Sequence, residues 1–220
     1  MNKQPDEKSL TQNFAPRQQG IRFIILHCTE VLDDAAALRV YMDPEAELSC
    51  HYYISYQGSI VQLVEDENTA WHAGRSAWQN TTGLNHHSLG IEIGNPGENA
   101  NVSFTEEQYK ALEDLLTGLM QTHNIPRENI LAHSDIATNR KRDPGNHFDW
   151  RRLEEKGLAA PFARPQGAQT ALQAIYKWGY HGEEADVIKA FQRRYLPEHM
   201  SGHMCEKTKL FIMNAPRQKK

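Results

Sequence analysis

Apolar residues along the chain gather in short runs whose spacing distinguishes strands from helices. Five runs have the length and composition of β-strands: residues 21–26, 51–56, 59–64, 88–95 and 129–132. The first run is nearly continuous in apolar residues, as is typical of a strand that is buried on both faces. The second and third runs flank Gln57-Gly58, a tight-turn signal, and therefore predict a β-hairpin.

Helical spacing occurs between and after these strands. Helices are predicted over residues 33–42, 105–123 and 148–155. Thr105 and Gln108 have the spacing of a capping box, which marks the start of the longest helix. The apolar stripe that follows, from Tyr109 to Met120, is interpreted as part of the core and not as a binding face. Together these elements predict an α/β domain.

The chain divides into four stretches of different character. Residues 1–19 are polar and are expected to form a disordered or loosely docked lead-in. Residues 20–156 form the main domain, and residues 157–169, with several Gly and Pro, form a linker. Residues 170–214 hold three short helical stretches. A segment of about 50 residues is marginal for a core of its own, so we expect it to pack on the main domain.

Composition excludes several classes of protein. The 220 residues are 39% hydrophobic and 24% charged, which is ordinary for a globular chain. A net charge of −4 provides no basic surface for nucleic acid. No run approaches the roughly 18 apolar residues that a membrane span needs. The polar start has no signal-peptide core, and the three cysteines make no disulfide framework.

The segment 131–145 carries the most concentrated candidate chemistry. It holds His133, Lys141 and Asp143, and a Thr-Asn pair and a Pro-Gly pair within it argue against regular structure. A His and an Asp that converge can bind zinc if a third ligand comes from elsewhere, and the lysine would then lie near the metal as a fixed positive charge. The alternative is a basic surface loop with a solvated histidine.

Two further polar residues stand on predicted strands. His27 follows the apolar run at 21–26, and ligands of open α/β sheets bind at such strand ends. A histidine there can equally be an ordinary hydrogen-bonded residue. Glu92 lies between Ile91 and Ile93, so it points to solvent in a half-buried strand and towards a cleft in a central one. Both alternatives remain open from the residues alone.

Five short motifs then occur in one order along residues 20–160. They are the strand that ends at His27, the hairpin at 51–58, Ala70-Trp71-His72-Ala73-Gly74, Ser88-Leu89-Gly90-Ile91-Glu92, and His133 with Arg140-Lys141-Arg142-Asp143-Pro144-Gly145. In this order they resemble the zinc-dependent N-acetylmuramoyl-L-alanine amidases (amidase type 2), a family that includes the peptidoglycan recognition proteins. Residues 170–214 are similar to the small helical peptidoglycan-binding domain found beside such catalytic domains. The alternative for that part is a helical extension that only stabilises the fold.

The resemblance implies a central mixed β-sheet flanked by helices, with a zinc cleft at the ends of its strands, and a small all-α C-terminal domain. It implies the following roles: His27, His133 and Asp143 as zinc ligands, Glu92 as the acid/base, Lys141 as the charge stabiliser and His72 as a substrate contact. The chain departs from the recognition-protein and phage branch at Cys50, where that branch often has a tyrosine. The tyrosine role is therefore not carried over. The third ligand is Asp, where that branch uses Cys.

The expected reaction is hydrolysis of the amide between the lactyl group of N-acetylmuramic acid and L-alanine, in peptidoglycan or in muropeptides. Two imidazoles and one carboxylate with an open position are the ligand set of a catalytic zinc site. The alternatives are a protein that recognises peptidoglycan without cutting it, and a zinc hydrolase that acts on another amide. Resemblance to a wall-binding domain implies the periplasm or cell envelope, whereas the polar start and the odd number of cysteines suggest the cytoplasm.

Overall fold

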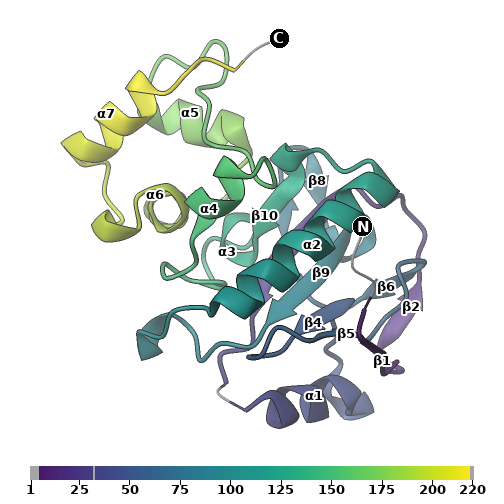
Figure 1. Cartoon of the computed structure of the whole chain (residues 1–220). Coiled ribbons are helices and arrows are strands. Elements are labelled where there is room, and N and C mark those ends of the chain that lie inside the picture. Colours follow the sequence, from purple (N-terminus) through teal and green to yellow (C-terminus); the bar gives the residue numbers. More distant parts are fainter. Residues whose placement is uncertain (1–4, 32, 219–220) are drawn as a thin grey trace.

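A six-stranded mixed sheet lies at the centre of the computed structural model, which describes residues 5–31 and 33–218 (Figure 1). In spatial order its strands are β1 (Glu7–Lys8), β5 (Ile60–Gln62), β4 (Tyr52–Ile54), β9 (Ser88–Ile93), β3 (Phe23–Cys28) and β10 (Ile130–Ala132). Two small sheets join β2 (Phe14–Pro16) to β6 (Asn68–Ala70) and β7 (Ala77–Trp78) to β8 (Thr81–Thr82). The expected central mixed sheet is thereby confirmed.

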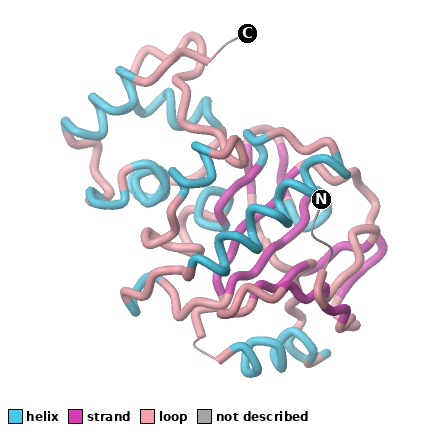
Figure 2. Tube along the Cα trace, viewed as in Figure 1, coloured by secondary structure: helices cyan, strands magenta, loops and turns pink. Residues whose placement is uncertain are grey.

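Helices cover both faces of this sheet (Figures 1 and 2). The α-helices are α1 (Asp34–Met42), α2 (Glu106–His123), α3 (His133–Ile136), α4 (Trp150–Glu155), α5 (Ala171–Trp178), α6 (Glu184–Tyr195) and α7 (Glu206–Asn214). Short 3₁₀ turns are η1 (Pro44–Ala46), η2 (Leu84–His87), η3 (Glu98–Ala100), η4 (Arg127–Asn129) and η5 (Pro197–His199). The capping box of α2 is formed as predicted, because the Gln108 backbone N–H donates to Thr105 Oγ1 and the Thr105 N–H donates to Gln108 Oε1.

Strand order decides which residues face which helix. β4, β9, β3 and β10 are parallel, and β5 returns antiparallel to β4 as the predicted hairpin. Along β3, Ile24 and Leu26 point into the cluster beneath α2, whereas Phe23 and Ile25 point to the opposite face. The central strands are therefore apolar on both faces, and polar side chains at their ends lie together at one edge.

The C-terminal helices pack directly on the second face of the sheet, as expected (Figure 1). One buried cluster includes Phe23, Ile25 and Leu131 from the sheet and Ile175, Val187 and Phe191 from the helices. Because the apolar side chains of these helices are buried against β3 and β10, sheet and helices share a core.

The lead-in is not disordered where the structure describes it. β1 pairs with β5 and β2 pairs with β6, and the buried Asn13 amide donates to the carbonyls of Tyr41 and Asp43. Residues 1–4 of the predicted lead-in lie outside the described residues. The expectation of a loose segment is wrong because backbone pairing at a sheet edge needs little apolar sequence.

A second expectation fails in the segment 131–145. Residues His133–Ile136 form the one-turn helix α3, although the segment was predicted to be irregular. The turn is held from within, because the Asp135 carboxylate accepts a hydrogen bond from the Ala132 backbone N–H at 2.9 Å. The remainder, up to Gly145, consists of turns and coil, as expected.

Candidate metal centre

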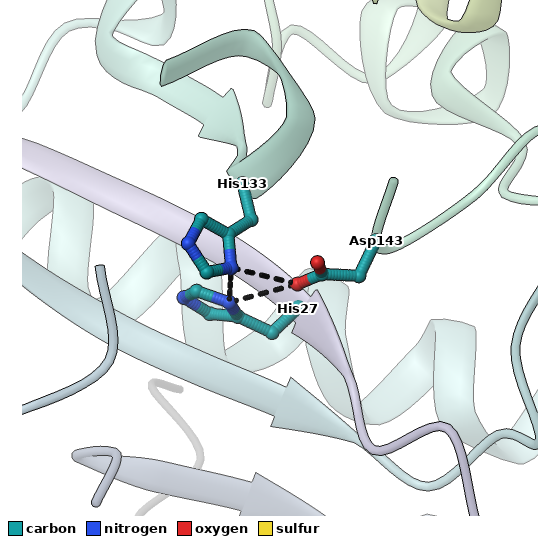
Figure 3. A group of neighbouring side chains, drawn as sticks. All are labelled: His27, His133 and Asp143. Atoms are coloured by element: carbon teal, nitrogen blue, oxygen red, sulfur yellow. Dashed lines mark hydrogen bonds and ion pairs between the residues drawn. The ribbon is translucent and has the colours of Figure 1, made fainter. Parts of the chain in front are cut away.

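Three side chains from separate elements converge at the carboxyl ends of β3 and β10 (Figure 3). His27 lies near the end of β3, His133 begins α3 directly after β10, and Asp143 comes from the following loop. The two Nδ1 atoms are 2.9 Å apart, and each lies 3.0 Å from Asp143 Oδ2. The structure thus brings together the three residues that the sequence resemblance implies as ligands.

All three groups are buried, so their charges are governed by one another. Burial, and to a smaller extent the neighbouring His133, lowers the pKa of His27 to about 4. That imidazole is therefore neutral at pH 7 and has a lone pair available. Although burial acts in the opposite direction, the two imidazoles hold the pKa of Asp143 well below its usual range, so the carboxylate is ionised.

The donor set fits a metal ion. Four-coordinate metal–ligand bonds of about 2.0–2.1 Å place the ligand atoms roughly 3.3 Å apart, close to the separations of 2.9 and 3.0 Å found here. Two imidazole nitrogens and one carboxylate oxygen leave further coordination positions open. The cluster can therefore hold a metal that also binds water or a substrate.

His72, expected to line the cleft, lies behind His27. Its Nδ1 is 3.0 Å from His27 Nε2, and only 4% of the residue is exposed. The far nitrogen of His133 also has a partner, because His133 Nε2 lies 3.3 Å from the Ala73 carbonyl oxygen. Both histidines of the cluster are thus contacted from behind by adjacent residues of one segment.

Glu92 occupies the neighbouring strand, in register with His27, so the two side chains share a face of the sheet. The solvent-facing alternative does not apply, since only 8% of Glu92 is exposed. Its Oε2 atom is buried without a hydrogen-bond partner among the described residues. Burial, with the negative charge of Asp143, raises the pKa of Glu92 to about 8.

Lys141 lies half-buried in the loop between His133 and Asp143, with its backbone N–H donating to the Ala137 carbonyl. Its ammonium lies close enough to lower the pKa of both Glu92 and His27. The positive charge therefore acts on the metal cluster and on the buried carboxyl together.

Sequence reasoning missed one side chain at this site. Tyr41, buried on α1, lies close enough to Glu92 for its side chain to offset part of the rise in the pKa of the carboxyl. Cys50, which occupies the place where the recognition-protein and phage branch often has a tyrosine, is buried close to Tyr41. Tyr41 has helical spacing within residues 33–42, so its pattern gave no sign of a contact with the site.

Comparison with known proteins matches residues 17–146 to the family model described as N-acetylmuramoyl-L-alanine amidase. The chain belongs to the N-acetylmuramoyl-L-alanine amidase family. It is 32% identical over 233 residues to the N-acetylmuramoyl-L-alanine amidase AmiD of Escherichia coli K12, a match that covers 90% of this chain and 82% of that protein. The amidase match therefore extends well beyond the metal site.

Solved amidase structures share the fold over nearly the whole chain. One is AmiD from E. coli in complex with the substrate anhydro-N-acetylmuramic acid-L-Ala-D-γ-Glu-L-Lys, with a TM-score of 0.77, 31% identity and coverage of 93% of this chain and 90% of that one. Another is AmpDh3 from Pseudomonas aeruginosa in complex with an anhydromuramic pentapeptide, with a TM-score of 0.76, 27% identity and coverage of 91% and 92%. Within residues 5–31 and 33–218 of this amidase, no helix has both the length and the apolar character that a membrane crossing requires.

The C-terminal helices of the amidase contact α3 through a buried ion pair. Arg194 on α6 donates to Asp135 Oδ2 at 2.5 Å, and the Tyr180 hydroxyl donates to Asp135 Oδ1 at 2.7 Å. The Arg194 guanidinium also lies 3.9 Å from the centre of the Trp150 ring. Since Asp135 is the third residue of α3, these contacts hold the helix that begins with His133.

Proposed function

We propose that this amidase uses zinc to hydrolyse the amide between the lactyl group of N-acetylmuramic acid and L-alanine in peptidoglycan or muropeptides. The observation that carries the proposal is the convergence of His27, His133 and Asp143 beside the buried Glu92. The relatives named above include two whose structures hold anhydromuramic peptides, which supports a substrate of this class.

The three ligands match the protein contribution to a catalytic zinc site, in which an open position remains. When bound there, zinc would lower the pKa of a water molecule to near 7 and polarise the scissile carbonyl. A carboxylate held ionised at neutral pH by two imidazoles suits this cation.

Glu92 is proposed as the acid/base. Its carboxylate would accept a proton from the attacking water and return it to the nitrogen of the departing L-alanine. A buried carboxyl whose pKa is raised to about 8 can both accept and donate a proton near neutral pH. The unpartnered Oε2 atom of Glu92 would be free for this exchange, with the Tyr41 side chain close to the carboxyl.

Lys141 is proposed as the charge stabiliser. Negative charge develops on the carbonyl oxygen as water attacks, and an ammonium close to the cluster would stabilise it. Lysine suits this role because its charge is compact and its stem is flexible. Removing one such group typically lowers the rate by about 10²–10³.

The C-terminal helices are proposed to contribute wall binding. A groove of about 1010 Å³ runs between α4 and the helices α6 and α7, with Tyr195 and Phe211 in its wall and the exposed Leu210 at its side. Such a groove supports attachment to a glycan and a location in the cell envelope. Leu210→Glu should reduce co-sedimentation with purified sacculi, whereas Val40→Glu, an exposed change on α1, should not.

The reaction is tested by digesting purified sacculi and a soluble muropeptide, with and without a chelator, followed by mass spectrometry. We expect release of peptides that begin with L-alanine, loss of this release with chelator, and its return when zinc is added. Activity on the soluble substrate alone would contradict the envelope assignment. Retention of sacculi by a zinc-loaded protein that releases no peptide would instead identify a recognition protein.

A further inference from the structure

The segment Trp71-His72-Ala73-Gly74 lies directly behind the metal cluster and contacts both of its histidines. His72 Nδ1 lies 3.0 Å from His27 Nε2, and the rings meet edge to face with centroids 5.1 Å apart. The carbonyl of the next residue, Ala73, lies 3.3 Å from His133 Nε2. Adjacent residues thus provide one partner for each imidazole.

The hydrogen bond between His72 and His27 has a direction that Ser88, on the other side of His72, determines. Ser88 Oγ lies 2.6 Å from the Leu84 carbonyl oxygen, which has no proton, so the serine hydroxyl must donate there. Ser88 Oγ therefore presents a lone pair to His72 Nε2, at 3.3 Å, and His72 Nε2 must carry a proton. In the neutral ring His72 Nδ1 is then an acceptor, and His27 Nε2 must be the donor.

The bond to His133 has only one possible direction. A backbone carbonyl only accepts, so His133 Nε2 must carry the proton that it donates to Ala73. Each neutral imidazole has a single N–H. With a metal ion bound, this proton therefore lies on Nε2 in both histidines, and the lone pair of each Nδ1 faces the space between the two rings and Asp143 Oδ2.

The segment is itself held in place. Asn85 Oδ1 accepts hydrogen bonds from the backbone N–H groups of His72, at 3.1 Å, and Ala73, at 2.6 Å. Gly90 leaves room for the His72 ring, since a Cβ at that position would lie 2.5 Å from His72 Cγ. Arg140 Nη2 donates to the same Ala73 carbonyl at 2.6 Å. His72 of one sequence motif therefore packs directly against Gly90 of another.

We propose that His72 and Ala73 are positioning residues of the metal centre, which fix the Nε2–H tautomers of His27 and His133 so that both Nδ1 lone pairs face the metal. His72 then acts behind a ligand and does not contact substrate. The inference rests on the proposed metal centre. Outer partners of this kind typically contribute 10–100-fold to metal affinity.

The test compares His72→Ala with His72→Asn, because an asparagine Oδ1 can accept a hydrogen bond near the place of the imidazole Nδ1. His86→Ala is the matched control, since His86 is an exposed histidine of the same region. Zinc affinity is measured at pH 7 by competition with a chromophoric chelator. We expect His72→Ala to weaken binding 10–100-fold, with His72→Asn and His86→Ala close to the unmodified protein.

Equal affinities for His72→Ala and the control would overturn the inference and leave the metal centre intact. Equal losses in both His72 variants would also overturn it, because the acceptor would then not matter. An unmodified protein that binds no zinc would remove the metal centre itself. If His72→Ala does not fold, ¹⁵N NMR of the zinc-loaded unmodified protein decides, since a proton on His27 Nδ1 with the metal bound through Nε2 would contradict the assigned direction.

Discussion

Replacing Arg194 by methionine should destabilise the whole amidase and weaken its metal site. The guanidinium is buried on α6, and Asp135, its partner on α3, is fully buried. Methionine approximates the length of the arginine stem but removes the charge and the hydrogen bonds to Asp135 and to the Ile130 carbonyl. The Asp135 carboxylate would then stay buried without a cation beside it.

The expected loss of stability depends on the hydrogen bonds that Asp135 keeps in the variant. Breaking a buried ion pair from one side costs about 3–5 kcal/mol, because an uncompensated charge is left in the interior. Asp135 would still accept from the Tyr180 hydroxyl and the Ala132 N–H, so we expect a value near the lower end, about 3 kcal/mol. Since α3 begins with His133, a proposed zinc ligand, zinc affinity should fall as well.

Urea unfolding at pH 7 measures the loss of stability, and chelator competition measures zinc affinity. Arg151→Met is the control, because Arg151 pairs with Glu155 at the surface with 85% of its side chain exposed, and exposed pairs contribute little. The double variant Asp135→Asn/Arg194→Met should lose less stability than the two single changes added together. Equal stability of Arg194→Met and Arg151→Met would refute the reasoning.

Three further predictions concern the site itself. Glu92→Gln should abolish peptide release yet stabilise the metal-free protein. The Glu92 carboxyl has a pKa near 4.5 in the unfolded chain and about 8 in the folded one, so the free energy of unfolding of the unmodified protein falls as the pH rises between these values. Glu92→Gln removes this loss and should stabilise the protein by up to about 3 kcal/mol at pH 7. Chemical denaturation from pH 4 to pH 8 measures the difference, and equal stability of the two proteins at pH 7 would show that the carboxyl is already ionised. Lys141→Ala should lower kcat by about 10²–10³ with zinc affinity retained, and an unchanged kcat would exclude the charge role. Gly90→Ala should displace His72 and lower the melting temperature, whereas Gly20→Ala, where a Cβ has open space and the backbone is not left-handed, should leave it nearly unchanged.

Local pattern alone predicted much of the architecture. The apolar run at 21–26 is a central strand, the turn at Gln57-Gly58 joins a hairpin, and Thr105 with Gln108 caps the longest helix. These features depend on residues close together in the chain, such as side-chain alternation, turn propensity and capping hydrogen bonds. The family resemblance named His27, His133 and Asp143 as candidate ligands, and the structure brings these three side chains together.

Only the tertiary structure decided what these residues face. The position of Glu92 between two isoleucines fits a half-buried strand and a central strand equally well. Glu92 is buried because β9 lies between β4 and β3. His72 acquires its place from Gly90 on a strand that begins sixteen residues later, and Asp135 acquires its partner from α6. Burial and partner choice depend on which segments pack together across long sequence separations. Sequence by itself therefore determined the longer elements and the chemistry available, whereas packing decided the short elements β1, β2 and α3 and which side chains are charged, held or exposed.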